Sequence, residues 1–272
     1  MLYTVVGAES TVNLWEGGTV PGRDLNRTFE LLWRAQKEPT RGPKPRLSLD
    51  EIVKAAIEIA DAEGLGAVSM RRLAERFGVT TMALYRYVPS KDDLLDLIID
   101  AIAYPPPDPA DLPENWREAL RWWSLQQRET MRRHPWLSVH EFSLPPMGPN
   151  NLRWMECALQ AILRSGLPAE QSITILMILT NYTIAETRQQ FTMAQALQLT
   201  DMAYEDVGRV YAGFVERIVS DGEHPALAEA IAAGAFGNTE ATVAGPDEDF
   251  LYGLDFILDG IEALAERRPA AT

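Results

Sequence analysis

The sequence is poor in residues that form cross-links or bind metals. Cys157 is the single cysteine among 272 residues, and the three histidines, His134, His140 and His224, are scattered along the chain. One cysteine excludes a disulfide framework within the chain, and no histidine has a second ligand at helical spacing. We therefore expect no metal, no cofactor and an intracellular, cytoplasmic protein.

Long hydrophobic runs are also missing. The most apolar stretch, Ile173 to Leu179, is broken by Thr180 and Asn181, well short of the roughly 20 residues that a bilayer needs. The first residues, MLYTVVGAES, have no basic lead and no compact apolar run with a cleavage site. We expect neither a signal peptide nor a membrane partner.

Catalytic motifs are absent as well. No serine stands in a nucleophile elbow and no glycine-rich loop is suited to cradle a phosphate. The sequence therefore disfavours an enzyme. The enzymatic alternative that stays open is a helical-bundle enzyme whose motifs are not visible in the sequence.

An overall basic charge, which nucleic-acid binding usually requires, is lacking too, since 25 basic and 39 acidic residues give a net charge of −14. The charge is unevenly distributed, however. Residues 41–91 carry nine basic and six acidic residues, which leaves +3 on this segment and −17 on the rest of the chain. This asymmetry is typical of a protein that presents one small basic face to phosphates.

Helix start and stop signals are concentrated between residues 46 and 104. Ser48 opens a capping box, Ser69 caps a second and shorter helix, and Gly78 stops that helix. A third helical segment follows at once from Thr80, and Ser90 caps a fourth that continues to residue 104. A helix, a tight glycine turn and a second helix at this spacing indicate a helix-turn-helix.

The regions on either side have a different character. Residues 1–45 form an N-terminal extension, in which Leu25, Phe29, Leu32 and Trp33 lie on one stripe of a short amphipathic helix. That helix either docks on the domain that follows or binds a partner. The proline-rich basic sequence PTRGPKPR then predicts an extended arm.

The prolines at 105–107 end the fourth helix. From residue 105 to residue 272, every segment with a period has the helical one. We predict helices at residues 151–164, 169–193, 201–221 and 247–267, preceded by a helix rich in tryptophan.

The stretch LSLDEIVKAAIEIADAEGLGAVSMRRLAERFGVTTMALYRYVPSKDDLLDLI resembles the DNA-binding domain of the TetR family of transcriptional regulators. The motifs that carry the resemblance stand in unbroken register and are Ser69, Arg71, Leu73-Ala74, Gly78-Val79, Leu84-Tyr85, Tyr87-Val88 and Ser90-Lys91. The resemblance implies an all-α fold, in which a helix-turn-helix DNA-binding domain (46–104) precedes a larger helical ligand-binding and dimerisation domain (105–272).

The resemblance also implies which residues meet double-stranded DNA, because the family's third helix enters the major groove. That helix corresponds to Thr80–Tyr87, where Thr81, Met82, Ala83 and Arg86 are suited to base edges. Phosphate contacts are expected from Tyr85, Tyr87, Ser90 and Lys91. Arg71 is expected to contact a phosphate or a base, and Arg86 a guanine or a phosphate. Taken singly, an arginine or threonine of this kind is more often a solvated surface residue than a DNA contact; the clustering on one short helix reverses this preference and favours a role in DNA binding.

Two basic groups have weaker assignments. Arg72 and Arg76 are interpreted as solvated surface residues. The arm residues Arg41, Lys44 and Arg46 either enter a minor groove or belong to a solvated linker.

Large soft side chains dominate the C-terminal region, and most of them are expected to form the core. A few are candidates to line an effector cavity beside polar interruptions of the apolar segment that starts at Ile173. The predicted effector-binding residues are Tyr104, Trp122, Trp123, Trp154, Met177, Asn181 and Tyr182. We expect a small apolar or aromatic effector.

The last helix suggests how two copies assemble. Phe250, Leu254, Ile257, Ile261 and Leu264 step by four and three residues, as in the seam of a helical bundle. These residues predict a homodimer interface, and two identical reading heads predict a palindromic operator. We expect a repressor that the effector releases through the fourth helix; an activator, or a regulator that acts through a protein partner, is the alternative.

Overall fold

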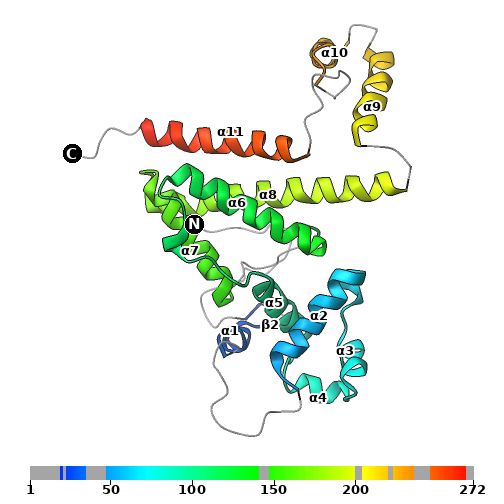
Figure 1. The fold of residues 1–272 in the computed structure, drawn as a ribbon, viewed down its shortest axis with the longest axis vertical. Helices are drawn as coiled ribbons and strands as arrows, with labels where there is room; N and C mark the ends of the chain where they lie inside the picture. Colours follow the sequence, from blue (N-terminus) through cyan, green and yellow to red (C-terminus); the bar gives the residue numbers. More distant parts are fainter. Residues whose placement is uncertain are drawn as a thin grey trace, which may run out of the picture. The chain divides into compact units, whose positions relative to one another are not determined.

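The computed structural model describes residues 19–20, 23–34, 47–140, 147–199, 204–219, 223–235 and 246–267 (Figure 1). Contacts divide the chain into two compact units. The first unit comprises residues 1–111 and 140–157, and the second comprises residues 112–139 and 158–272. The described residues 147–157 thus belong to the first unit, although they follow the proline run at residue 105.

The first unit is built from short helices. Its elements, in chain order, are the paired strands β1 (Thr19–Val20) and β2 (Arg23–Asp24), then α1 (Leu25–Arg34), α2 (Leu49–Glu63), η1 (Leu65–Ala67), α3 (Met70–Phe77), α4 (Thr81–Tyr85), α5 (Lys91–Ile102) and η2 (Pro109–Asp111). The strands form an antiparallel pair of two residues each. Apart from that pair, the described part of the first unit is helical, as the sequence predicts.

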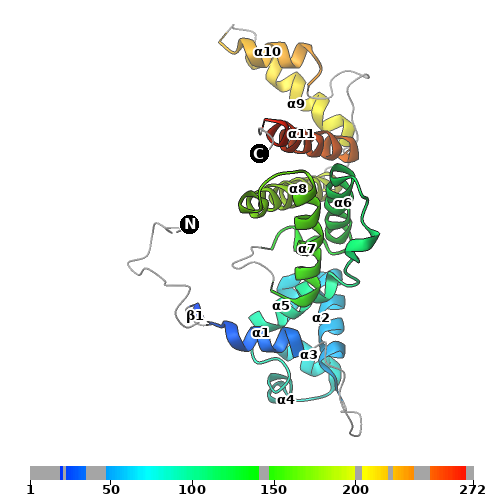
Figure 2. The same ribbon diagram turned by 90° about the vertical axis from the view of Figure 1, so that its left-hand side faces the viewer.

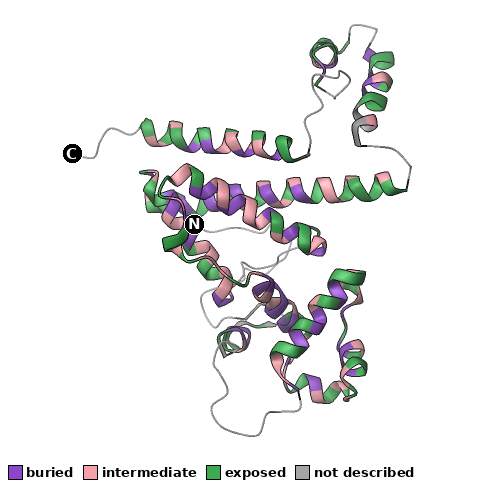
Figure 3. Cartoon of the chain, in the orientation of Figure 1, coloured by how far each residue is buried: buried purple, intermediate pink, exposed green. Residues whose placement is uncertain are grey.

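Local capping decides where these helices begin. Ser48 N donates to Glu51 Oε2 (2.7 Å) and Glu51 N donates to Ser48 Oγ (3.2 Å), which completes the predicted capping box of α2. Gly78 ends α3 in the left-handed region, with φ 63° and ψ 34°, where a side chain would be strained. The core between α2 and α5 consists of fully buried residues such as Ile52, Leu73, Leu84, Leu94 and Ile98 (Figure 3).

The second unit is built from longer helices. They are α6 (Trp116–Arg133), η3 (Pro135–Leu137), the end of α7 (Pro149–Arg164), α8 (Ala169–Gln198), α9 (Tyr204–Val219), α10 (Pro225–Ala232) and α11 (Pro246–Glu266). Helix α8 packs against both α6 and α11 (Figures 1 and 2). The buried centre of the second unit includes Leu120, Trp123, Leu179, Phe250 and Leu254.

The predicted helices of this unit are present with shifted ends, and one helix was not predicted. Helix α8 continues to Gln198, five residues beyond the expected end. Helix α10 is new; Pro225 occupies its first turn, and Leu227 and Ile231 pack on α9 beside Val215 and Val219. None of the described helices is long and apolar enough to cross a membrane.

Candidate nucleic-acid interface and effector pocket

Helix α4 is anchored in the core on one side and exposes side chains on the other. Thr80 caps the helix, since Ala83 N donates to Thr80 Oγ1 (3.3 Å), and Leu84 is fully buried against the neighbouring helices. The α-helix ends at Tyr85, and Arg86 and Tyr87 form the turn that follows, whereas the sequence predicted helix as far as Tyr87. Two backbone bonds to the Leu84 carbonyl, from Tyr87 N (2.8 Å) and Val88 N (2.9 Å), close this turn.

The outward face of α4 has the composition of a surface that contacts another molecule. Met82 is 72% exposed although it is apolar, and Tyr85 is 42% exposed. Thr80 and Arg86 are exposed as well, and Thr81, Ala83 and Tyr87 are partly buried. An exposed methionine on a short helix, flanked by hydroxyls and a guanidinium, is suited to base edges and thymine methyls in a major groove.

The start of α5 lies beside this face in the sequence and offers a second kind of contact. Ser90 Oγ caps α5 by accepting from Asp93 N (3.0 Å), and it donates to Asp93 Oδ2 (2.7 Å). Lys91, the first helical residue, is exposed. A cation together with a helix N-terminus is a combination that binds phosphate well.

The N-terminal helix α1 is attached to the same end of α5. Thr28 is buried, and its Oγ1 donates to Asp93 Oδ1 (2.7 Å), while Leu32 is also buried. Asp93 therefore joins α1 to the cap of α5, which favours the docking role for α1 that the sequence left open. Phe29 and Trp33 remain on the exposed side of α1, with ring centroids 5.4 Å apart.

The arginines of α3 divide into two kinds. Arg72 and Arg76 form ion pairs with Glu63 and Glu58 of α2, so they tie the two helices together. Arg71 pairs within its own helix, with Nε 3.0 Å from Glu75 Oε1, and its side chain is 84% exposed. An exposed pair of this kind is weak, so Arg71 is the α3 arginine that can most easily turn to a phosphate. Arg41, Lys44 and Arg46 lie outside the described residues.

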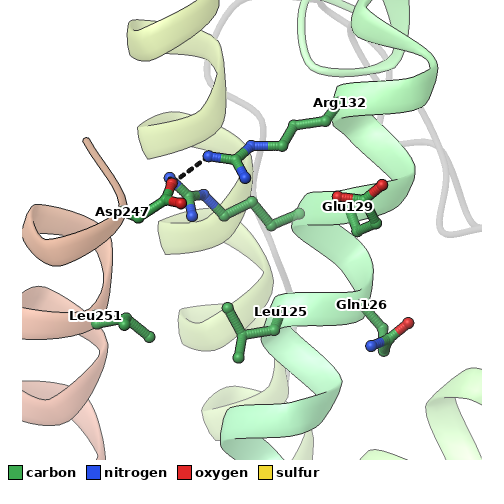
Figure 4. Close-up of a pocket in the computed structure, with 7 residues that line it drawn as sticks. Leu125, Gln126, Glu129, Arg132, Asp247 and Leu251 are labelled. Atoms are coloured by element: carbon green, nitrogen blue, oxygen red, sulfur yellow. Dashed lines mark hydrogen bonds and ion pairs between the residues drawn. The ribbon is translucent and has the colours of Figure 1, made fainter. Parts of the chain in front are cut away.

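A pocket of about 290 Å³ lies in the second unit (Figure 4). It is lined by Leu125, Gln126, Arg128, Glu129, Arg132, Asp247 and Leu251. The first five residues belong to α6, and Asp247 and Leu251 belong to the first turns of α11. Among the described residues, no cluster of His, Cys, Asp or Glu is arranged to hold a metal ion.

Arg128 is the central charged group beside this pocket. Its side chain is only 3% exposed, and its Nη2 lies 2.9 Å from Asp247 Oδ1 and donates to Gln190 Oε1 (2.8 Å). Its guanidinium carbon stands 4.4 Å from the centre of the Phe250 ring. Burial lowers the pKa of Arg128, and the charge of Arg132 lowers it further, while Asp247 acts in the opposite direction.

Asp247 holds two arginines at once, because Arg132 also pairs with it (Figure 4). The hydrogen bond from Arg132 is the main reason that the pKa of Asp247 is lowered. Further along the same helices, Arg117 pairs with Asp259 and Arg121 pairs with Asp255. A row of ion pairs thus fastens α11 to α6 along its length.

Tyr182 of α8 fastens the start of α11 from another side. Its hydroxyl donates to the Phe250 carbonyl oxygen (2.8 Å), and its ring stacks on that of Phe250 at 5.4 Å. A Cβ at Gly253 would overlap the Tyr182 hydroxyl, so glycine is required for this approach. Burial raises the pKa of Tyr182 to about 12, and the hydroxyl therefore remains a proton donor at neutral pH.

Two polar groups of α6 are buried without a hydrogen-bond partner among the residues that the structure describes. They are Ser124 Oγ and Gln127 Oε1. Such groups are rare in folded proteins because leaving them unpaired is unfavourable; both belong to the same helix as most of the pocket residues, although neither lines the pocket itself. The sequence analysis missed both of them together with Arg128, although polar residues within the apolar stripe of Leu120, Trp123 and Met131 are a usable signal.

Comparison with known proteins identifies the relationship. Residues 108–265 match the tetracyclin repressor-like C-terminal domain, and residues 52–98 match the bacterial regulatory proteins of the tetR family. The HTH-type transcriptional repressor DrrR1 of Streptomyces coeruleorubidus is 39% identical over 247 residues, which cover 90% of this chain and 88% of DrrR1. The chain belongs to the TetR family. It is thus a DNA-binding transcriptional regulator and not an enzyme.

Solved structures and more distant relatives agree with this membership. The TetR family protein ActR of Streptomyces coelicolor, in complex with actinorhodin, matches with a TM-score of 0.66 and 28% identity, and the match covers 82% of this chain and 99% of ActR. The tetracycline repressor protein class E of Escherichia coli is 27% identical over 148 residues, 53% of this chain and 69% of that protein.

Within this TetR chain, the predicted effector-binding residues are dispersed. Trp154 and Tyr104 belong to the first unit, where Trp154 Nε1 donates to the Ala103 carbonyl oxygen (2.8 Å) and Tyr104 is exposed. Trp123 is buried in the core of the second unit, and Trp122 is partly buried. None of the seven predicted residues lines the pocket beside Arg128.

Two of the predicted residues lie on the outer face of their helix. Met177 and Asn181 lie on the exposed side of α8, because the helix turns Leu176, Leu179 and Thr183 inward instead. The residues four apart that we took for cavity positions are therefore on its outer face.

The predicted dimer seam also needs correction. Phe250, Leu254 and Ile261 are buried within the single chain and have no surface left for a partner. Their stripe packs on α8, because the unit's own core takes the most apolar face of α11. Ile257 is partly buried and Leu264 is half exposed, so these two of the five predicted residues remain available.

Proposed function

We propose that this TetR-family regulator is a repressor that binds a palindromic operator as a homodimer and is released by a small, largely aromatic effector. The single observation that carries the proposal is the α4 face. There an exposed Met82 and exposed hydroxyl and guanidinium groups stand on a short helix that Leu84 anchors in the core. Curated relatives such as DrrR1 are named repressors, which supports repression over activation.

Readout of the operator falls to α4 and the residues around it. Thr81, Met82, Ala83 and Arg86 are proposed to meet base edges in the major groove. The proposed phosphate ligands are Thr80, Arg71, Tyr85, Tyr87, Ser90 and Lys91. The arm cations Arg41, Lys44 and Arg46 stay a prediction from the sequence alone.

A second copy of the chain is the proposed occupant of the exposed apolar faces of α8 and α11. On α8 these faces carry Ile173, Met177 and Ile178, and on α11 they carry Tyr252, Phe256 and Leu264. Exposed apolar side chains on two packed helices are typical of an interface between copies. Two identical reading heads related by a two-fold axis then require two half-sites, which makes the operator a palindrome.

The effector is proposed to bind in the second unit beside Arg128. Ser124 Oγ and Gln127 Oε1 are buried groups that lack a partner among the described residues, and both stand within one turn of Arg128 on α6. The Arg128 guanidinium already lies over one aromatic ring, that of Phe250, and a flat aromatic ligand is suited to the same kind of contact. ActR was solved in complex with actinorhodin, which supports an effector of this class.

Selection of duplexes from a random pool with the purified protein tests the proposal. We expect a palindromic consensus. Arg86→Ala should lower discrimination at particular base pairs by about 1–3 kcal/mol if the contact is bidentate, and Lys91→Ala should weaken all duplexes alike. Arg76→Ala is the matched control, since Arg76 is also an exposed arginine of the first unit but is paired with Glu58, and it should leave discrimination unchanged.

A selected pool without a consensus would contradict operator recognition. Equal losses on selected and random duplexes for Arg86→Ala and Lys91→Ala would contradict the assignment of base and phosphate contacts. A monomer at micromolar concentration in sedimentation would contradict the homodimer.

A further inference from the structure

Helix α5 carries a buried carboxylate near each of its ends. Asp93 is 6% exposed and Asp100 is 7% exposed. Asp93 serves the cap of α5 and the attachment of α1, as described above. Asp100 belongs to neither of these tasks, and burying a carboxylate is unfavourable unless its oxygens are well bonded.

The Asp100 carboxylate is bonded to the beginning of α7. The backbone amides of Asn150 and Asn151 both donate to Asp100 Oδ1 at 3.0 Å. Asn150 Nδ2 donates to Asp100 Oδ2 (3.0 Å), and Asn151 Nδ2 donates to Asp100 Oδ1 (3.0 Å). Asp100 thus caps the N-terminus of a helix from outside that helix, at the positive end of its dipole.

Further bonds tie the same two segments through the backbone. Asn150 Nδ2 also donates to the Asp100 carbonyl oxygen (3.2 Å), and Asn151 Nδ2 donates to the Ile99 carbonyl oxygen (3.3 Å). Gly148 lies so close that a Cβ there would overlap the Asp100 carboxylate. We name this arrangement of Asp100, Gly148, Asn150 and Asn151 the α5–α7 clasp.

The hydrogen bonds of the clasp make a gradual movement of α7 relative to α5 unfavourable. Every hydrogen bond to the Asp100 carboxylate in the clasp comes from an N–H group of Asn150 or Asn151. The carboxylate therefore depends on these two residues for its hydrogen bonds within the clasp. Burial raises the pKa of Asp100, and the bonds from the two asparagines oppose that rise. A small slide of α7 along α5 would leave a buried carboxylate without donors, which is more unfavourable than moving both helices together.

We propose that Asp100 is a positioning residue that couples α5 to α7 in the switch. At one end of α5 stand Ser90 and Lys91, the proposed phosphate contacts, and at the other end stands the clasp. Helix α7 continues from the clasp into the second unit, where Ala158, Ala161 and Ile162 are buried. Any bias on α7 is therefore passed to α5, and any restraint on α5 by the operator is passed to α7. This inference rests on the proposed function.

Hydrogen exchange of the full-length protein, followed by mass spectrometry with and without a selected operator duplex, tests the coupling without knowledge of the effector. In the unsubstituted protein, operator binding is expected to slow exchange in residues 149–157 by about fivefold or more, the lower end of typical coupling between sites. Asp100→Asn replaces one acceptor oxygen with a donor that faces Asn150 Nδ2. This variant should bind the operator but lose the slowing in residues 149–157.

Asp93→Asn is the matched control, because it is the same substitution at a similarly buried position of the same helix, and the contacts of Asp93 go to Ser90 and Thr28. At a duplex concentration that saturates the Asp93→Asn variant, operator binding should still slow hydrogen exchange in residues 149–157. Asn151→Ala is the milder second variant in case Asp100→Asn does not fold; it removes two side-chain bonds and should reduce the slowing.

The outcomes separate this inference from the proposed function. If no duplex is bound, the proposed function fails and the inference falls with it. If the operator is bound and slows α5 alone, or slows residues 149–157 equally in Asp100→Asn, Asn151→Ala and the unsubstituted protein, the coupling role of Asp100 is overturned while operator binding stands.

Discussion

The DNA-binding region and the helical region that follows it differ in how regularly side chains cap the starts of their helices. From α2 to α5, each α-helix begins at a serine or threonine whose side chain accepts a backbone hydrogen bond, at Ser48, Ser69, Thr80 and Ser90. In the second unit the picture is mixed: Asn115 caps α6 by accepting from Arg117 N and Glu118 N, whereas α8 begins after Pro168 and α10 after His224, and neither of these two has a side-chain cap. Local caps thus start every α-helix from α2 to α5 but only some of the helices of the second unit, where the long α8 depends on its packing against α6 and α11.

The difference shows where each region is sensitive to substitution. A lost cap costs about 0.5–2 kcal/mol, whereas a large side chain removed from a core costs about 3–5 kcal/mol. The long helices of the second unit should therefore respond most to changes in packing. The short helices of the first unit should respond measurably to single hydroxyl groups as well.

The largest effect is expected at Phe250. The residue is fully buried, stacks on Tyr182 and lies beneath Arg128, so Phe250→Ala should lower the free energy of unfolding by about 3–5 kcal/mol. Phe256, on the same helix and 61% exposed, is the matched control. Phe256→Ala should instead weaken association of two copies.

Urea unfolding at several protein concentrations, with sedimentation in parallel, measures both quantities. If Phe250→Ala is nearly neutral and Phe256→Ala is the more damaging to the isolated subunit, then the seam that we first predicted is correct, and the burial described above is not what stabilises α11.

A smaller effect is expected at Ser48. Ser48→Ala removes the hydroxyl that caps α2 and should destabilise the protein by about 1 kcal/mol. Pro168→Ser makes the opposite change at the start of α8 and should be neutral or slightly stabilising, because it adds a cap where the structure has none. Thermal unfolding of the two variants measures the contrast; equal losses in both would abolish the distinction between the two regions.

The smallest effect concerns pH. Burial raises the pKa of Asp100 above its ordinary value of 3.8, so the native state binds this proton more tightly than the unfolded chain does. The contribution of Asp100 to stability is then fully present below pH 3.8 and declines as the pH rises through the raised native pKa. The difference in unfolding free energy between the unsubstituted protein and Asp100→Asn should therefore shrink or change sign from acid toward neutral pH. A pH-independent difference would show that the native pKa is not raised.

What could be predicted from the sequence follows the same division. The capping box at Ser48, the glycine stop at Gly78 and the helices around them were predictable because each signal acts over three or four residues. The all-α fold and the family relationship followed from that region. Helix α10 was missed because its apolar residues are few and only its packing on α9 explains it.

The candidate sites were harder to predict for a related reason. The exposed side chains of α4 were found because the family motif places them. By contrast, the seam through Phe250 and the cavity positions Met177 and Asn181 depended on which face of a long helix is turned inward. Helices α8 and α11 have apolar residues on more than one face, so periodicity alone does not distinguish a core face from a partner face.

Gly148 and Asp100 are 48 positions apart in the chain, yet the space that a side chain at one would need is filled by the other. Which residues can be accepted at position 148 therefore depends on the residue at position 100. A lineage that acquires alanine at 148 must also shorten or displace the acid at 100, and with it the donors at 150 and 151. Among descendants of this sequence, a side chain at position 148 should therefore occur only together with a smaller residue or a moved backbone at position 100.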